Sequence, residues 1–235
     1  MTLATVLEPE VHIADLPAEL RNGQQKAIPA LIDYFADHDR GILWMCCGSG
    51  KTVTLAIFAE MLGEQLTVIF TPRIKLVKQW RDNYLQWLPT TQAKFMCVCS
   101  EKDDAPGIDP LTEARLLGAD PEDTAEEFDQ LLADAQESRG QMQVSVDPEE
   151  IAAFLRQDGR KVIVSTYASS PVYGEAQRLA KLVAGLGICD EAQHTATGDR
   201  DTPYTYPLID RNIRIRKRVF TGQPPILSPE FNSVF

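Results

Sequence analysis

The sequence predicts an α/β fold with a mainly parallel sheet and helices on both faces. Short runs that are apolar and β-branched throughout alternate with amphipathic stretches along the 235 residues. Strands that are apolar on both sides are typical of a parallel sheet whose two faces are covered by helices. A chain of this length is sufficient for one well-buried domain. We therefore expect a single domain over residues 1–235.

Six strands and six helices are expected. The strand predictions rest on apolar, β-branched composition, and the helix predictions on apolar residues that recur every three or four positions. The expected strands are residues 42–46, 67–71, 95–99, 162–166, 186–190 and 218–221. The expected helices are residues 23–36, 51–62, 74–87, 125–135, 148–157 and 172–184. Because ligands of such sheets bind at the carboxyl ends of the strands, the residues after each strand are the candidates for function.

The net charge of −11 is concentrated in one segment. Residues 101–150 contain 16 acidic and three basic residues, whereas the rest of the chain contains 18 acidic and 20 basic residues. The overall acidity therefore does not exclude nucleic acid as a partner. We expect 101–150 to be an acidic, partly helical insertion within the domain. Two interpretations of it stay open: a solvated surface insertion, or a docking or autoinhibitory element that competes for a basic groove.

The five cysteines and the hydropathy indicate a cytoplasmic protein. The cysteine count is odd and no Cys-x-x-Cys occurs, which favours reduced thiols. Cys97 and Cys99 alternate along one expected strand without a second Cys/His pair, so a metal site there is not favoured. No apolar stretch is long enough to span a membrane, and the first residues do not resemble a secretory signal. No membrane partner is expected.

A phosphate-binding loop is predicted between the first strand and the following helix. Gly48 and Gly50 permit a tight turn whose amides point at phosphate oxygens, at the amino end of a helix. Lys51 would reach the β- and γ-phosphates, and the Thr52 hydroxyl would coordinate Mg²⁺. Met45 occupies the first glycine position of the general pattern. The alternative is a glycine-rich turn that binds nothing. The residues expected to line this loop are Cys47, Gly48, Ser49, Gly50, Lys51 and Thr52.

An acidic strand end is the second candidate. The apolar run 186–189 delivers Asp190 and Glu191 to the end of an expected strand. Asp190 fits the Mg²⁺-side acid, and Glu191 fits the residue that polarises the attacking water. The alternative is an exposed turn. Because both motifs follow strands of one predicted parallel sheet, we expect them to converge in space.

These two segments resemble motifs I and II of superfamily-two helicases and translocases. The loop reads Met-Cys-Cys-Gly-Ser-Gly-Lys-Thr. Asp-Glu-Ala-Gln-His is similar either to a DEAH-type box with Gln193 as one extra residue before His194, or to a DEAQ-type box. Further segments match in the expected order: Gln24 in an adenine-reading glutamine motif, Thr71-Pro72-Arg73 in motif Ia, Thr166-Tyr167 in motif Ib and Thr221-Gly222-Gln223 in motif III. Thr-Ala-Thr-Gly after His194 makes restriction-type helicases the most similar group.

The resemblance implies a RecA-like lobe that uses ATP and Mg²⁺ as cofactors. Lys51, Asp190, Glu191 and His194 would be catalytic, with His194 coupling to motif III, and Thr52 and Asp190 would hold Mg²⁺. The motif Ia and Ib residues would contact nucleic acid, with DNA favoured over RNA, and Thr221, Gly222 and Gln223 would couple the two activities. A second RecA-like lobe, which would supply an arginine to the transferring phosphoryl group, is not found before Phe235 and is expected in cis or trans.

The expected function is therefore the ATPase lobe of a superfamily-two DNA translocase of a restriction or phage-defence system, weak or inactive in isolation. One alternative is a stand-alone, nucleotide-dependent binding module that switches a partner without translocation. A small-molecule kinase is a weaker alternative, because it leaves the other motifs unexplained.

Two further groups of residues, one aromatic and one basic, allow more than one interpretation. Trp80, Tyr84 and Trp87 lie on the expected helix 74–87, where core packing explains them better than base stacking. Residues 211–218 include five cations. This basic run is either an electrostatic contact for nucleic acid or a partner domain, or a solvated strand.

Overall fold

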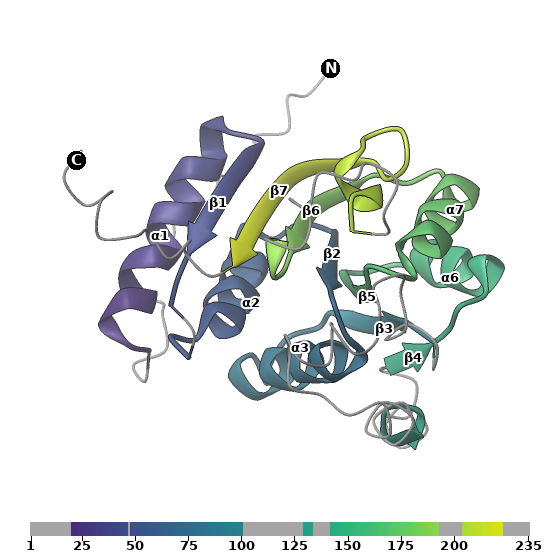
Figure 1. The fold of residues 1–235 in the computed structure, drawn as a ribbon, viewed down its shortest axis with the longest axis horizontal. Helices are drawn as coiled ribbons and strands as arrows, with labels where there is room; N and C mark the ends of the chain where they lie inside the picture. Colours follow the sequence, from purple (N-terminus) through teal and green to yellow (C-terminus); the bar gives the residue numbers. More distant parts are fainter. Residues whose placement is uncertain (1–19, 47, 101–128, 134–141, 193–203, 223–235) are drawn as a thin grey trace, which may run out of the picture.

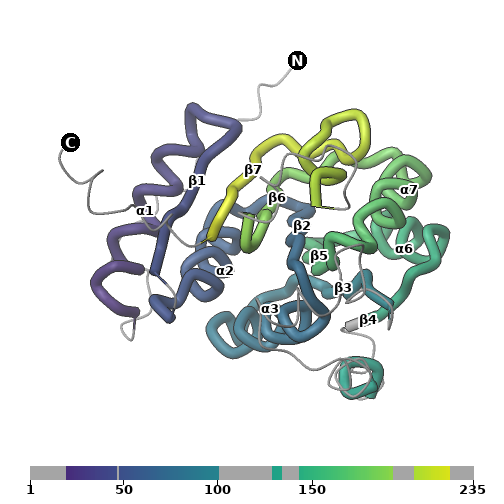
Figure 2. The backbone as a smooth tube through the Cα atoms, in the orientation of Figure 1, coloured from purple at the N-terminus to yellow at the C-terminus, as the bar shows by residue number. Residues whose placement is uncertain are grey.

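A parallel sheet organises the protein, as the sequence predicts. In the computed structural model, residues 20–46, 48–100, 129–133, 142–192 and 204–222 are described, and within them one seven-stranded sheet has the order β1-β7-β6-β2-β5-β3-β4. Every pair of neighbouring strands is parallel. Figure 1 shows the sheet with helices on its two sides, and Figure 2 follows the chain as it returns to the sheet after each helix.

The elements alternate along the chain. The strands are β1 Arg40–Trp44, β2 Leu66–Thr71, β3 Lys94–Val98, β4 Met142–Val144, β5 Lys161–Thr166, β6 Ala184–Cys189 and β7 Ile215–Gly222. The helices are α1 Asn22–Asp37, α2 Lys51–Leu62, α3 Ile74–Trp87, α6 Pro148–Leu155 and α7 Ser170–Ala180, with a short 3₁₀ helix, η3, at Tyr206–Leu208.

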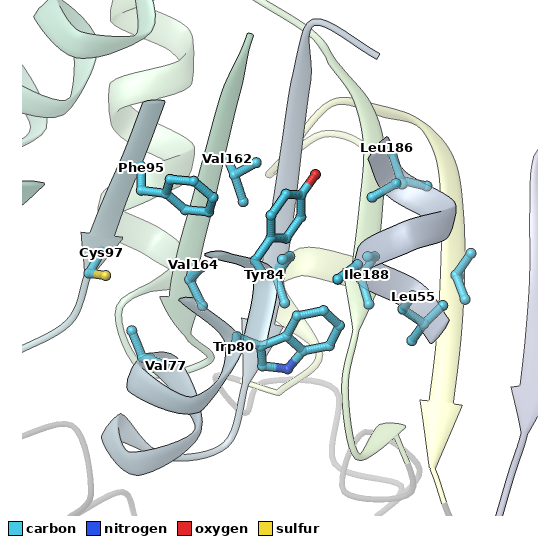
Figure 3. Packing of buried hydrophobic residues seen from close by; sticks show 14 of the residues in the cluster. Leu55, Val77, Trp80, Tyr84, Phe95, Cys97, Val162, Val164, Leu186 and Ile188 are labelled. Atoms are coloured by element: carbon cyan, nitrogen blue, oxygen red, sulfur yellow. The ribbon is translucent and has the colours of Figure 1, made fainter. Parts of the chain in front are cut away.

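Three helices cover one face of the sheet. Helices α1, α2 and α3 pack against every second residue of the strands, such as Ile69 of β2 and Val164 of β5. Figure 3 shows Trp80 and Tyr84 of α3 lying across this face. Both rings are buried, so core packing is confirmed for these two aromatic residues.

The other face is covered by α6 and α7. Here the alternate strand residues, such as Phe70 of β2 and Ile163 of β5, form a second buried cluster with the apolar residues of these helices. Because successive side chains of a strand point to opposite faces, this division explains why the inner strands are apolar throughout. Strands β2, β5 and β6 each have six residues, and every one of these residues is buried.

Several helix and strand boundaries differ from those expected from the sequence. Strand β1 begins and ends two residues before the expected 42–46, because the chain turns into the phosphate loop after Trp44. Helix α7 ends at Ala180 rather than 184, because Lys181 adopts a left-handed conformation (φ 58°) whose amide donates to Arg178 and Gln177 carbonyls. This turn lets β6 begin at Ala184. Strand β4 and η3 were not expected.

The end of the predicted acidic insertion belongs to the domain. Residues 142–144 pair with β3 as the edge strand β4, and Pro148 begins α6. Asp147 caps this helix, because its side chain accepts the Glu149 amide at 2.9 Å. Residues 129–133 are helical, as expected, and Leu131 packs into the α1–α3 face. Residues 101–128 and 134–141 lie outside the described residues.

The cations of the basic run 211–218 differ in their burial. Arg218 on β7 is only 1% exposed, and its guanidinium bonds to Asp210 Oδ1 at 2.5 Å and to the Ile213 carbonyl at 2.9 Å. Arg40 of β1 reaches the same Asp210 oxygen at 3.2 Å. Arg214 and Arg216 are exposed. One cation of this run therefore joins the turn before β7 to the sheet, while these two others face solvent.

No helix within the described ranges is long and apolar enough to cross a membrane.

We expect Asp210→Asn to lower the free energy of unfolding by about 1 kcal/mol at neutral pH, because buried Arg218 loses a charged acceptor that is itself exposed and partly screened. The hydrogen bond from Arg218 lowers the pKa of Asp210 below its usual value. Because the folded-state pKa is the lower one, this stabilisation is present above the unfolded pKa and is lost as the pH falls through the folded value. The difference between the two proteins should therefore narrow below about pH 4.

Urea unfolding at several pH values measures this difference. Asp33→Asn, on the exposed side of α1, is the control and should change little. A difference that stays constant down to acid pH would contradict the role of the Asp210 charge.

Candidate functional site

The predicted motifs meet at the carboxyl ends of the strands. Since the strands are parallel, the phosphate loop after β1 and the acidic residues after β6 leave the sheet in the same direction, with only β7 between these strands. The ladder continues one residue past β6, because the Asp190 amide donates to the Phe70 carbonyl at 2.9 Å. The carboxyl ends of β2, β5 and β6 therefore lie side by side.

The phosphate loop is a tight turn before α2. Gly48 and Gly50 have φ values of +70° and +89°, a region that side chains disfavour. Ser49 closes the turn, since its amide and its hydroxyl both donate to the Cys46 carbonyl, at 3.2 and 2.6 Å. Gly50 is the residue before α2 and provides no side-chain cap. The first amides of α2 thus remain available to an anion, and Lys51 and Thr52 begin this helix.

Two residues at the start of α1 hold the loop in place. The Arg21 guanidinium donates to the Gly48 carbonyl at 2.6 Å, and the side-chain nitrogen Nε2 of Gln24 donates to the Gly50 carbonyl at 3.2 Å. The side-chain oxygen Oε1 of Gln24 accepts the Arg21 main-chain amide at 3.0 Å. Gln24 is 4% exposed, and a Cβ on Gly50 would lie 2.5 Å from its nitrogen. The residue predicted to read adenine therefore also supports the phosphate loop.

Asp190 is buried and held by hydrogen bonds. Its carboxylate accepts the Trp80 indole N–H at 2.8 Å on Oδ2 and the Glu191 amide at 3.0 Å on Oδ1. Its carbonyl accepts the Tyr167 hydroxyl at 2.9 Å. Burial raises the pKa of Asp190 to about 6; the Trp80 hydrogen bond opposes this shift and the neighbouring Glu191 charge adds to it. A carboxylate has about four acceptor positions, so oxygen lone pairs remain for a cation.

Lys51 and Glu191 bring the two motifs into contact. The Lys51 ammonium lies 3.9 Å from Glu191 Oε1 and donates to the Met45 carbonyl at 3.4 Å. Glu191 has a φ of +49°, a left-handed conformation that costs a non-glycine residue about 1 kcal/mol. Strain of this kind is concentrated at functional sites. The convergence expected from the two strand ends is therefore observed.

The motif Ia and Ib residues also lie at the carboxyl ends of the strands, but most of them are buried. Thr71 and Thr166 are paired across β2 and β5 and are fully buried, and Pro72 and Tyr167 are also buried. Arg73 is half-buried, and its guanidinium has no hydrogen bond or ion pair to the residues that the structure describes. Of these five residues, only Arg73 is thus partly exposed, and the Tyr167 ring is not accessible from the surface.

Other predicted site residues are placed only in part. Thr221 and Gly222 end β7, where they pair with Leu43 and Trp44 of β1. They lie between the strands that lead to the phosphate loop and to the acidic strand end, and their coupling role stays a prediction. Cys47, Gln193, His194 and Gln223 lie outside the described residues, so their roles stay predictions.

Two contributors could not be found from the sequence. Arg21 has no helical or strand pattern that separates it from other surface cations, and its partner Gly48 lies 27 positions away. Trp80 matches the core face of α3 by its spacing, and only the tertiary fold brings its N–H to Asp190, 110 positions later.

Comparison with known families shows to which family the chain belongs. Residues 17–219 match the family described as Type III restriction enzyme, res subunit. The chain belongs to this family. The resemblance to restriction-type helicases of superfamily two is thereby confirmed, and the domain is a RecA-like, helicase-type ATPase lobe. No curated protein matches the sequence.

Two solved structures share the fold. A nuclease-deletion mutant of the Type ISP restriction–modification enzyme LlaGI, in complex with a DNA substrate mimic, is 23% identical with a TM-score of 0.62. The ATP-dependent Type ISP restriction–modification enzyme LlaBIII, bound to DNA, is 22% identical with a TM-score of 0.57. The matches cover 89% and 88% of this chain but 18% and 13% of those chains. This chain thus spans less than a fifth of either protein.

We expect Gly50→Ala to destabilise the protein more than Gly48→Ala. Both place alanine at a positive φ, which costs about 1 kcal/mol. Only the Gly50 variant also forces the Gln24 amide away, which removes hydrogen bonds worth about 1 kcal/mol each. Denaturant unfolding measures both effects. Adding Gln24→Ala should lower the free energy of unfolding less in the Gly50→Ala background than in the wild type. Equal losses of unfolding free energy in Gly48→Ala and Gly50→Ala would contradict the role of Gln24.

Proposed function

We propose that this chain binds ATP with Mg²⁺ and hydrolyses it as the first lobe of a DNA-dependent translocase of a restriction system. The observation that carries the proposal is the contact between Lys51 of the phosphate loop and Glu191 of the acidic strand end, beside the buried Asp190. The contact places a cation that can bind phosphate oxygens beside a carboxylate that can accept a proton from water. A site built this way matches the chemistry of phosphoryl transfer from a nucleoside triphosphate to water.

Each residue of the site has a separate task. Lys51 and the first amides of α2 would bind the β- and γ-phosphate oxygens. A bound phosphate competes for the Lys51 charge, which frees the Glu191 carboxylate to accept a proton from the attacking water. Gln24 would contact the adenine from its position beside Gly50, so base and phosphate contacts are linked through one side chain.

The donor set near Lys51 fits a hard cation. Thr52 provides a hydroxyl and Asp190 a carboxylate, and oxygen atoms are the ligands that Mg²⁺ prefers. When bound, Mg²⁺ neutralises charge on the phosphate oxygens. Asp190 would hold it either directly or through a water, and the Trp80 and Glu191 N–H groups keep the carboxylate in one orientation.

The polymer substrate is inferred from Arg73 and from the relatives. Arg73 offers a cation on the same edge as the ATP site, and phosphate contacts of this kind supply affinity without reading sequence. The LlaGI and LlaBIII structures contain DNA or a DNA mimic, which favours DNA over RNA. The Type III restriction family supports a role in restriction and phage defence.

A second RecA-like lobe is required for full activity in this proposal. Such a lobe would supply an arginine to the transferring phosphoryl group, worth about 10³–10⁵ in rate. The chain by itself should therefore bind ATP but turn it over slowly. DNA-stimulated turnover by the chain alone would instead favour the alternative of a stand-alone, nucleotide-dependent module.

We expect Lys51→Ala to abolish binding of a fluorescent ATP analogue, because it removes the charge that faces the phosphates. Glu191→Gln should keep this binding but lower phosphate release by about 10²-fold or more, because an amide cannot accept the proton. Lys26→Ala, on the exposed surface of α1, is the control for lost charge. Undiminished binding by Lys51→Ala would overturn the proposed nucleotide site.

Arg73→Gln should weaken DNA binding about equally for all sequences and reduce the slope of log affinity against log salt by about 1, because one phosphate contact is lost. Fluorescence anisotropy with a labelled duplex at several salt concentrations gives both quantities. Arg178→Gln is the matched control, because Arg178 is exposed in the last turn of α7, at the opposite edge of the sheet. Equal effects of the two substitutions would place the DNA elsewhere.

A further inference from the structure

Asp190 is restrained through its side chain and its main chain by two aromatic residues from other elements. Trp80 donates to the carboxylate oxygen Oδ2 at 2.8 Å, and Tyr167 donates to the carbonyl oxygen at 2.9 Å. Both aromatic side chains are 1% exposed, and Asp190 is 6% exposed. Neither contact involves the phosphate loop, so they act on the acidic strand end alone.

The Trp80 indole is a rigid donor. It is embedded in the cluster formed by α1, α2, α3 and the sheet, and in Figure 3 its nitrogen points towards the carboxyl ends of the strands. A side chain packed in this way cannot turn to follow a carboxylate. The carboxylate must instead adopt the orientation that the indole allows, which leaves its remaining lone pairs in a defined direction.

Tyr167 restrains the backbone of the same residue. It follows the end of β5, and its ring packs against Phe70 and Tyr204 in the cluster on the other face of the sheet. The two contacts therefore approach Asp190 from opposite faces. The chain turns after Asp190 into the left-handed Glu191, so a fixed carbonyl also fixes where that turn begins.

We propose that Trp80 and Tyr167 are positioning residues that orient Asp190 for Mg²⁺, Trp80 through the carboxylate and Tyr167 through the main chain. The inference rests on the proposed function, since it assigns a purpose to these contacts within that same site. Partners of metal-binding side chains that do not touch the metal commonly change metal affinity by about 10–100-fold when removed. A buried indole N–H also needs an acceptor for stability alone, and the test must separate these two roles.

Trp80→Phe keeps an aromatic ring and removes the N–H. We expect this variant to raise the Mg²⁺ concentration needed for half-maximal binding of a fluorescent ATP analogue by about tenfold. Binding of the same analogue in excess chelator should change less than about twofold, because Lys51 and the loop are untouched. A purely structural role would lower stability without changing the Mg²⁺ dependence.

Tyr84→Phe is the matched control. Tyr84 lies one turn further along α3 in the same cluster, and its hydroxyl donates to Glu60 at 2.9 Å. In Figure 3 this hydroxyl points to the opposite edge of the sheet from the Trp80 nitrogen. The control should lose stability and keep the wild-type Mg²⁺ dependence. An equal Mg²⁺ shift in Trp80→Phe and Tyr84→Phe, or no shift in either, would overturn the role of Trp80.

Tyr167→Phe tests the main-chain contact, with Tyr173→Phe, a buried tyrosine of the same cluster, as its control. We expect Tyr167→Phe to shift the Mg²⁺ dependence in the same direction as Trp80→Phe, and Tyr173→Phe to leave it unchanged. A wild-type dependence in Tyr167→Phe would overturn the role of Tyr167 and leave that of Trp80 to its own variant.

The indole N–H resonance of Trp80 provides a measurement in the unmutated site. The chain contains two other tryptophans, Trp44 and Trp87, so replacing them identifies the Trp80 signal even if Trp80→Phe does not fold. The signal should shift when Mg²⁺ is added to the nucleotide complex, and Asp190→Asn should abolish this response. An unresponsive signal in a protein that binds the nucleotide would overturn the inference alone. A wild-type chain that binds no nucleotide would overturn the proposed function and the inference together.

Discussion

The parallel pairing of β2 with β5 and β6 is the constraint on which the site depends. Thr71 pairs with Thr166, and Phe70 pairs with Cys189, so these strands end at the same level. Backbone hydrogen bonds carry the pairing one residue further at Asp190 and at Tyr167, each 2.9 Å long. A shift of one residue in β6 would turn Asp190 to the other side of the sheet and separate it from Trp80.

The acidic centre is an extension of the core rather than an addition to its surface. A carboxylate at 6% exposure is costly unless hydrogen bonds or a cation offset its lost hydration. The offset comes partly from Trp80, which belongs to the largest apolar cluster, and partly from the backbone amide of Glu191. Packing of α3 against the sheet therefore also sets the orientation of the Asp190 carboxylate. A substitution that loosens α3 should change this orientation directly.

The phosphate loop depends on a different neighbour. Its two glycine carbonyls are held by Arg21 and Gln24, which stand at the start of α1 rather than on β1 or α2. Helix α1 packs on α2, so the loop is confined between its own helix and the helix before it. The two halves of the site are thus supported by separate helices, α1 for the loop and α3 for Asp190, and they meet at the pair Lys51–Glu191.

Elements with strong local patterns were predicted accurately. Helices α2 and α3 have the expected bounds, because glycine or proline lies close beyond each end of both. Helix α3 also has apolar residues at helical spacing, whereas residues 53–59 of α2 are buried without a break. Strand β4 was missed because it is three residues long and forms only by pairing with β3 at the edge of the sheet. The end of α7 was misplaced because Lys181, rather than a glycine, adopts the left-handed conformation that terminates it.

The sequence by itself determined the fold class and the strand-end location of both motifs, while the roles of Lys51, Thr52, Asp190 and Glu191 stay predictions. These features depend on local composition and on the rule that parallel strands share one functional edge. Only the tertiary structure decided that Trp80 and Tyr167 hold Asp190, that Arg21 supports the loop, and that Arg218 is buried with Asp210. Most of these contacts join residues far apart in the chain, and the direction of each donor is set by packing, which no local pattern encodes.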